Sequence, residues 1–341
     1  MNDFRKTDPD FMRKKAAEIL PSMRYDGRED FDGWKERAGE KLYDLLGLPF
    51  APCDDLFAAG PETDCGDFVR KDFSFQSEEG YFVPAALLGP KGLSGPLPVA
   101  VCIQGHTSGM HISLGIRRFP GDEESIAGGR DFARRAVKEG YCAVVLEQRY
   151  MGMCGCDETG SSACITRNAA LPALLLGRCA IGERVWDVQR LLDILGTYFS
   201  ADADMERIVC LGNSGGGTVS FYAACVDDRI RLTVPSCAVC EFEDSIIPIH
   251  HCGCNYIPGI RKFFEMGDLG GLIAPRDLVL VCGVQDPIFP IEGVEKSYER
   301  IRSVYRHIGM EGHCRILRGE GGHRFYADLA WPVINELVES L

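Results

Sequence analysis

The alternation of apolar runs with amphipathic helical segments constrains the fold of this chain more strongly than any other feature. From residue 131 onward, segments with the composition of buried strands alternate with segments whose apolar residues recur at helical spacing. This order is typical of a mostly parallel sheet with helices on both faces. The predicted strands cover 141–146, 207–211, 232–235, 278–283 and 314–317, and the predicted helices cover 131–139, 184–195, 294–308, 331–341 and a segment that begins near residue 218.

Three further strands are predicted upstream, at 68–75, 80–88 and 99–103. Their connections are short, which favours antiparallel pairing among them. Together with the later strands they predict a central sheet of about eight strands.

The N-terminal part of the chain follows a helical pattern. Residues 8–48 are charged with apolar residues at helical intervals, and we interpret them as two helices followed by a loop over 49–67. The sequence therefore predicts an N-terminal helical extension (residues 1–66) packed on the core of a larger α/β catalytic domain (residues 67–341).

Residues 212–216 carry the sharpest chemical signal. They read Gly-Asn-Ser-Gly-Gly, which matches the pattern G-x-S-x-G, and they lie between an apolar strand and a helix. This context is typical of a nucleophile elbow, a tight and strained turn in which a side chain at either glycine would clash with its surroundings. The N-terminus of the following helix directs N–H groups at the reacting oxygen. We predict Ser214 as a nucleophile; the alternative is a glycine-rich turn without chemistry.

Two downstream residues complete a serine triad in the chain order Ser, acid, His. Asp286 follows the predicted strand 278–283, at the sheet edge where active sites of α/β folds form. His323 follows the last strand through a glycine-rich loop. We predict that Asp286 orients the imidazole and that His323 is the general base. The alternatives are a turn-forming aspartate and a solvated histidine, and Asp268 is a second candidate for the acid.

An oxyanion hole needs two donors placed where negative charge develops. We predict the backbone N–H groups of Gly215, directly after the nucleophile, and of His106, in the loop after the strand 99–103. The His106 imidazole either lines the pocket or anchors the loop. Residues 147–149 (Glu-Gln-Arg) end a strand at the same edge, and we expect them to form an ion pair or polar network beneath the site.

Two segments rich in Cys and His raise the question of a metal site. Residues 250–254 read His-His-Cys-Gly-Cys, and residues 154–156 read Cys-Gly-Cys. Neither has the paired C-x₂-C spacing of structural zinc sites. We therefore expect no metal and no cofactor, and we interpret both segments as loops that shape a substrate pocket, with His250 and His251 as substrate contacts.

The charge balance excludes large classes of partners. The chain has 37 Lys and Arg residues against 50 Asp and Glu residues, a net charge of −13, which repels phosphate backbones and anionic lipid headgroups. Nucleic acid and membranes are not expected as partners, and a neutral small molecule is accepted more easily than an anion unless a local basic patch overrides the global field.

No apolar signal segment follows the first residues, and no apolar run reaches the roughly 18 residues of a membrane span, so the predicted location is the cytoplasm. We interpret the 16 cysteines as reduced thiols.

Five short segments carry a family resemblance. They are 104–106 (Gln-Gly-His), 182–187 (Gly-Glu-Arg-Val-Trp-Asp), 212–217 (Gly-Asn-Ser-Gly-Gly-Gly), 286–287 (Asp-Pro) and 321–325 (Gly-Gly-His-Arg-Phe). Together they resemble bacterial α/β-hydrolases described as acetyl xylan esterase-like, over about residues 70–341. The resemblance implies the α/β-hydrolase fold and hydrolysis of short acyl esters, foremost acetyl groups on sugars, without a cofactor.

The sequence departs from the related cephalosporin-C deacetylase group at three places. That group has Gln after the nucleophile, where this chain has Gly215, and Glu after the catalytic His, where this chain has Arg324. It also has Arg-Gly-Gln after a strand, where residues 148–150 read Gln-Arg-Tyr. Hexamer formation and deacetylation of cephalosporins are therefore not carried over to this chain.

Three other functions are compatible with parts of the pattern. A serine peptidase of the prolyl-oligopeptidase type usually carries a large N-terminal domain such as a propeller, which about 70 mostly helical residues cannot form. A non-catalytic binding protein on the same fold would have no reason to keep the three triad residue types in order. A metal-dependent hydrolase would lose activity to chelators.

Overall fold

A nine-stranded sheet forms the centre of the molecule. The structure is a computed structural model that describes residues 8–93, 95–155 and 158–341. The strands are β1 (Ala58–Asp64), β2 (Phe68–Glu78), β3 (Tyr81–Pro90), β4 (Leu97–Ile103), β5 (Cys142–Leu146), β6 (Ala203–Asn213), β7 (Ile230–Ser236), β8 (Asp277–Gly283) and β9 (Cys314–Gly319). Their order is β1-β2-β3-β5-β4-β6-β7-β8-β9. The pairs β1–β2, β2–β3 and β3–β5 are antiparallel. The other five pairs, from β5–β4 to β8–β9, are parallel.

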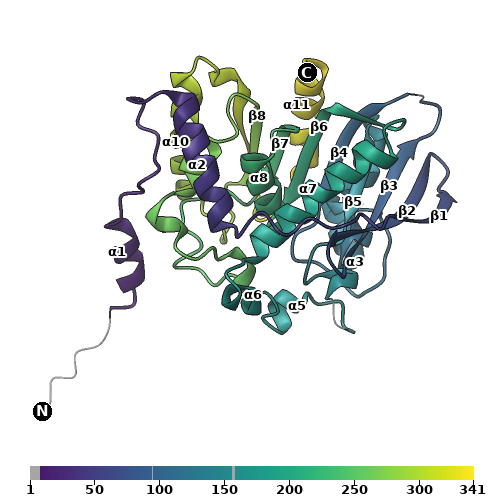
Figure 1. The fold of residues 1–341 in the computed structure, drawn as a ribbon, viewed down its shortest axis with the longest axis horizontal. Coiled ribbons are helices and arrows are strands. Elements are labelled where there is room, and N and C mark those ends of the chain that lie inside the picture. Colours follow the sequence, from purple (N-terminus) through teal and green to yellow (C-terminus); the bar gives the residue numbers. More distant parts are fainter. Residues whose placement is uncertain (1–7, 94, 156–157) are drawn as a thin grey trace, which may run out of the picture.

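Helices cover both faces of this sheet (Figure 1). They are α1 (Phe11–Ala17), α2 (Phe31–Leu45), α3 (Asp122–Ser125), α4 (Phe132–Lys138), α5 (Ala163–Thr166), α6 (Leu171–Leu175), α7 (Ala180–Tyr198), α8 (Gly215–Val226), α9 (Met266–Gly270), α10 (Ile291–His307) and α11 (Ala327–Glu339). Helices α2, α7, α8 and α10 share one hydrophobic cluster with the sheet, and α4 and α11 share a second. The prediction of a mostly parallel sheet between two helical layers is confirmed.

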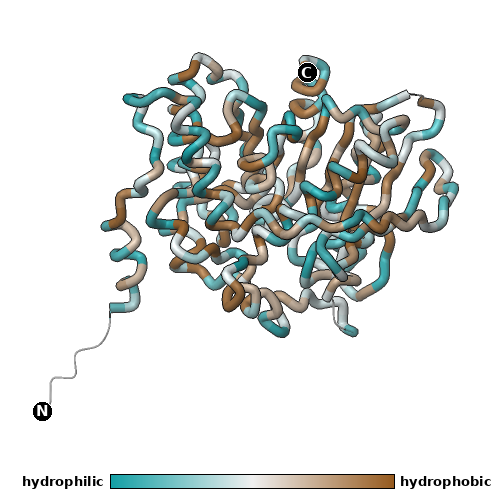
Figure 2. Tube along the Cα trace, in the orientation of Figure 1, coloured by the Kyte–Doolittle hydropathy of each residue, from teal (hydrophilic) through white to brown (hydrophobic). Residues whose placement is uncertain are grey.

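The period-two alternation of the strands divides the core between the two faces. In β4, Val99, Val101 and Ile103 belong to the cluster with α7 and α8, whereas Ala100 and Cys102 belong to the cluster with α4 and α11. Both sets are buried, which explains why the strand reads as one continuous apolar run. Figure 2 shows the apolar segments concentrated in the strands at the centre of the molecule.

Helix α2 fixes the N-terminal segment to the core. It begins where the Asp30 carboxylate accepts a hydrogen bond from the Gly33 N–H at 2.9 Å, which satisfies one free helix donor. Trp34, Ala38 and Leu42 recur every four residues and are fully or almost fully buried against the sheet cluster. Helix α2 therefore contributes directly to the main core.

Two predictions about the first strands are wrong. The segment predicted as a loop over 49–67 contains β1, which pairs antiparallel with β2 at the edge of the sheet, so the sheet begins before residue 67. The strand predicted at 99–103 lies within β4, which pairs only in parallel, with β5 and β6. The reason is that β5 inserts between β3 and β4, so neighbours in sequence are not neighbours in the sheet.

No helix in the described part of the chain is both long enough and apolar enough to cross a lipid bilayer.

Candidate active site

Loops at the carboxyl ends of four parallel strands bring the predicted catalytic residues together. Ser214 follows β6, Asp286 follows β8, His323 follows β9 and His106 follows β4. Ser214, His323, His106 and Gly215 line one pocket of about 340 Å³. This is the edge at which ligands bind in open α/β sheets.

Ser214 lies on a strained turn between β6 and α8. Its φ is 58° and its ψ is −127°, a conformation that favours glycine and costs roughly 1–3 kcal/mol for other residues. The turn also requires close backbone contacts. A Cβ on Gly212 would lie 2.5 Å from the carbonyl carbon of Gly216, and a Cβ on Gly216 would overlap the carbonyl oxygen of Ile103. The turn therefore has the geometry of a nucleophile elbow.

Asp286 and His323 form a hydrogen-bonded pair. His323 Nδ1 lies 2.8 Å from Asp286 Oδ2, and Asp286 Oδ1 accepts from the N–H groups of Ile288 at 2.8 Å and Phe289 at 3.2 Å. Burial opposes ionisation of the Asp286 carboxyl, but the hydrogen bond and charge of His323 and the two backbone donors outweigh it and lower its pKa. The ionised carboxylate holds the proton on Nδ1, which leaves Nε2 as the basic nitrogen.

Ser214 and His323 line the same pocket, and no hydrogen bond joins their side chains. No hydrogen bond joins Ser214 Oγ to any residue that the structure describes, whereas the ring of His323 stacks on Phe289 with centroids 5.8 Å apart. Catalytic hydrogen bonds are often long in the free enzyme and tighten when substrate binds. The three residues therefore occupy one site in which the Asp286–His323 hydrogen bond is already formed.

The loop after β4 lies against Ser214. A Cβ on Gly105 would lie 3.0 Å from Ser214 Cβ, and a Cβ on Gly215 would lie 3.1 Å from the His106 ring. Gly215 is the first residue of α8, a position whose N–H has no partner within a helix. The His106 N–H donates to no residue in the described ranges. Both predicted oxyanion donors are therefore close to Ser214 and unpaired.

Known structures share this architecture. A provisionally assigned acetyl xylan esterase from Bacteroides fragilis superposes with a TM-score of 0.75 at 17% identity, covering 94% of this chain and 84% of that protein. A glucuronoyl esterase from Solibacter usitatus superposes with a TM-score of 0.69 at 14% identity, covering 95% of this chain and 99% of that protein. The chain has the α/β-hydrolase fold.

One curated protein is related to this chain in sequence. The provisionally named hydrolase YtaP of Bacillus subtilis (strain 168) is 27% identical over 249 residues, which cover 70% of this chain and 77% of the relative. No protein-family model matches the chain.

The two predicted substrate contacts, His250 and His251, both line the pocket that contains Ser214 and His323. His250 is exposed, and His251 is half-buried with its Nε2 3.1 Å from Ser245 Oγ. Burial lowers the pKa of His251 to about 4, and the charges of the neighbouring His106, His250 and His323 act in the same direction. His251 is therefore neutral at physiological pH and can donate or accept a hydrogen bond.

Sequence reasoning missed a cation in the same pocket. Arg130 ends a short π-helical turn (Ile126–Arg130), is half-buried and lines the pocket beside Ser214 and His323. Its guanidinium makes no hydrogen bond or ion pair with any described residue. No motif marks such a residue, because its position depends on how the loop folds back over the sheet edge.

The polar network predicted for residues 147–149 is confirmed. Arg149 forms two bonds of 2.9 Å with the buried Asp187 carboxylate, and Gln148 donates to the carbonyl of Gln104, which precedes the loop carrying His106. Glu147 accepts backbone N–H bonds of 3.0 and 3.2 Å, and burial nevertheless raises its pKa to about 7. The network thus stabilises the start of the loop that carries His106.

Asp268, the second candidate for the catalytic acid, lies away from the pocket. It accepts hydrogen bonds from the Glu265 N–H at 2.7 Å and from Arg24 at 3.1 Å, and Arg300 lies 3.6 Å away. These contacts cap α9, so Asp268 has a structural role.

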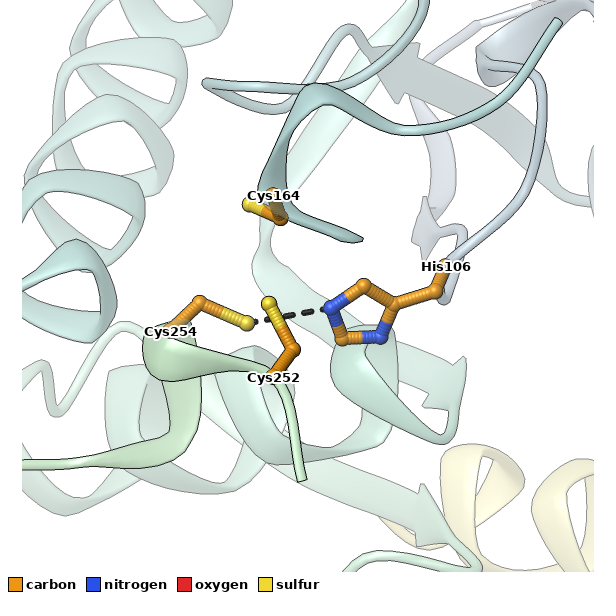
Figure 3. Close-up of side chains that lie close together, drawn as sticks. All are labelled: His106, Cys164, Cys252 and Cys254. Atoms are coloured by element: carbon orange, nitrogen blue, oxygen red, sulfur yellow. Dashed lines mark hydrogen bonds between the residues drawn. The ribbon is translucent and has the colours of Figure 1, made fainter. Parts of the chain in front are cut away.

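Four possible metal donors converge at one wall of the pocket. The ligand atoms of His106, Cys164, Cys252 and Cys254 all lie within 4.8 Å of one another (Figure 3). We expected no metal site because neither Cys-rich segment has zinc-type spacing, but this cluster combines residues from separate loops. The segment 154–156 is not part of it, and Cys156 lies outside the described residues.

Proposed function

We propose that this protein is a serine carboxylic-ester hydrolase that acts on short acyl esters by an acyl-enzyme mechanism. The observation that carries the proposal is the Asp286–His323 hydrogen bond, whose histidine lines one pocket together with a serine on a strained strand–helix turn. The named structural counterparts are esterases, and the sequence relative is named as a hydrolase.

Each residue has a defined step in this mechanism. Ser214 Oγ attacks the carbonyl carbon of the ester while His323 Nε2 takes its proton. The N–H groups of Gly215 and His106 stabilise the negative oxygen of the tetrahedral intermediate. The imidazolium then protonates the leaving alcohol, and a water molecule activated by His323 releases the acid from the serine. Asp286 stabilises the imidazolium throughout.

The size and lining of the pocket favour a small, polar ester. A volume of about 340 Å³ lies at the lower end of the range for small-molecule sites. Histidine, arginine and asparagine side chains contribute much of the lining, and they suit hydroxyl groups better than long alkyl chains. We therefore favour acetyl groups on a sugar or a similar small polyol, in the cytoplasm as the sequence predicts.

Kinetics on p-nitrophenyl esters of increasing acyl length test the short-acyl part of the proposal. We expect kcat/KM to fall at least about tenfold from acetate to octanoate, because a longer chain must be placed in a small pocket lined by polar groups. A preference for octanoate would contradict it, and faster cleavage of aminoacyl-nitroanilides than of esters would favour the peptidase alternative.

Arg130 is expected to select for negative charge or hydroxyl groups on the substrate. Replacing it with alanine breaks no ion pair with a described residue, so the fold should tolerate the change. For an acetyl ester that carries a carboxylate, we expect KM to rise about 10-fold or more, since a charge-assisted hydrogen bond contributes roughly 1.5–3 kcal/mol. For neutral phenyl acetate the change should stay below about threefold.

The matched control for Arg130→Ala is Arg117→Ala. Arg117 pairs with Glu123 on an exposed part of the same loop region and does not line the pocket. Equal KM changes for charged and neutral esters in Arg130→Ala would show that the guanidinium does not contact substrate.

A further inference from the structure

The four donors described above come from three segments that are distant in sequence. His106 lies in the loop after β4, and Cys164 lies on α5. After β7, Cys252 directly precedes a 3₁₀ turn (Gly253–Asn255) and Cys254 lies within it. Figure 3 shows the sulfur atoms of Cys252 and Cys254 and a ring nitrogen of His106 directed toward a common space, with Cys164 beside them. His106 Nε2 lies 3.0 Å from Cys254 Sγ.

The spacing of these atoms suits a tetrahedral metal ion. With Zn–S bonds of about 2.3 Å, the sulfur atoms of a tetrahedral site lie about 3.8 Å apart. The ligand atoms here lie within 4.8 Å of one another, so small side-chain movements are enough to reach that geometry. Three cysteines and one histidine form a common donor set of structural zinc sites, and soft thiolates select zinc over hard cations.

A buried charge provides an independent observation. Arg184 on α7 is 1% exposed, yet its guanidinium forms no ion pair with a carboxylate in the described ranges. Its Nη2 instead lies 3.0 Å from Cys164 Sγ, and Nε and Nη2 also donate to the carbonyl of Arg149. Its Nη1 has no hydrogen-bond partner among the residues that the structure describes. A buried cation without a counter-charge is strongly unfavourable.

Zinc binding would supply that counter-charge. A Zn²⁺ ion held by three thiolates and a neutral imidazole carries a net charge of minus one, which matches the single positive charge of Arg184. Arg184 would then be an outer-shell residue that donates to a ligating sulfur.

We propose that His106, Cys164, Cys252 and Cys254 bind one Zn²⁺ ion in a closed, tetrahedral site at the wall of the active-site pocket. Binding forms three Zn–S bonds and one Zn–N bond, and the three thiol protons pass to solvent. With all four positions filled by the protein, no position is left for an activated water, so the ion has a structural role.

The metal site would fix the positions of the loops that line the active-site pocket. Cys164 and Cys252 line the substrate pocket, and the His106 ring lies over Gly215 beside the oxyanion hole. The ion would therefore join the oxyanion loop to the two loops that form the far wall of the pocket. The inference does not depend on the proposed ester chemistry, because metal content and stability can be measured without a substrate.

Metal analysis of the purified full-length protein tests the proposal. After exhaustive dialysis we expect about one zinc per chain by plasma mass spectrometry and by native mass. The double variant Cys252→Ala/Cys254→Ala should lose at least about nine-tenths of it. The control Cys282→Ala removes a buried cysteine of β8 outside the cluster and should keep a full complement.

A second measurement on the wild type covers the case in which the double variant does not fold. Removing the metal with a chelator should lower the melting temperature, and adding Zn²⁺ should restore it. Cobalt(II) in its place should give the visible absorption of a tetrahedral cobalt–thiolate centre. Wild-type protein that holds no zinc after exposure to Zn²⁺, that holds iron instead, or that has a disulfide among the three cysteines would overturn the proposal.

Discussion

Replacing Ser214 with alanine is expected to reduce kcat for acetyl esters by about 10⁴-fold or more. The alanine keeps the Cβ but removes the only atom that can form the acyl-enzyme, so catalysis falls to the residual effect of binding and of the oxyanion hole. KM should change little, because the hydroxyl contributes mainly to the reaction and not to ground-state binding. Steady-state kinetics on p-nitrophenyl acetate measure both.

The control for this variant is Ser220→Ala. Ser220 lies on the same helix, is buried, and donates only to the carbonyl of Gly217, so activity should remain within a fewfold of the wild type. Ser214→Gly adds a second check. Because Ser214 has a φ of 58°, glycine should relieve backbone strain and raise stability by about 1 kcal/mol while activity is lost. Retained activity in Ser214→Ala would contradict the assignment.

Replacing Asp286 with asparagine is expected to lower kcat by about 10³- to 10⁴-fold with the fold intact. Asparagine has the same shape and can still accept from the N–H groups of Ile288 and Phe289. Its amide nitrogen would then face His323 Nδ1, which favours the tautomer with the proton on Nε2, and that tautomer cannot accept the serine proton. Kinetics together with a melting curve separate this effect from unfolding.

Asp268→Asn is the matched control for the acid. Asp268 caps α9 and interacts with Arg24 and Arg300, so its replacement should cost about 1–3 kcal/mol of stability but leave kcat within a fewfold. If instead Asp268→Asn abolished activity and Asp286→Asn did not, the acid would be misassigned.

A structural zinc ion would affect how the loss of activity on addition of a chelator is interpreted. A structural ion at the pocket wall would make activity fall on chelation even though serine performs the chemistry. Chelator sensitivity alone therefore does not favour the metal-dependent hydrolase considered as an alternative, whereas covalent labelling of Ser214 distinguishes the two mechanisms.

The proposed triad could be assembled from the sequence because each of its three residues has a local signal. Ser214 lies in a glycine-rich turn whose close contacts require Gly212 and Gly216, and Asp286 and His323 directly follow apolar strands in the expected order. In parallel sheets the carboxyl ends of strands meet at one edge, so chain order was enough to place these residues together.

Other features depend on contacts between distant segments. Strand β1 is exposed and contains Gly60 and Pro61, so it lacks the alternation of a half-buried strand and is held by backbone pairing with β2. The parallel setting of β4 follows from the insertion of β5, which no short connection reveals.

The cysteine–histidine cluster and Arg130 were not predicted for the same reason, because each depends on contacts between distant segments. Cys164 is 58 residues from His106 and 88 residues from Cys252, so no spacing rule for a zinc motif could detect the cluster. Arg130 carries no motif at all, and only the fold shows that it lines the pocket with no ion-pair partner in the described part of the chain.

Intact-mass analysis after treatment with a fluorophosphonate tests the central claim most directly, because the reagent forms a covalent bond only with an activated serine. The account predicts one adduct per chain on the wild type and on Ser220→Ala, and none on Ser214→Ala. Absence of an adduct on the wild type, or an adduct that persists in Ser214→Ala, would contradict the assignment of Ser214 as the nucleophile.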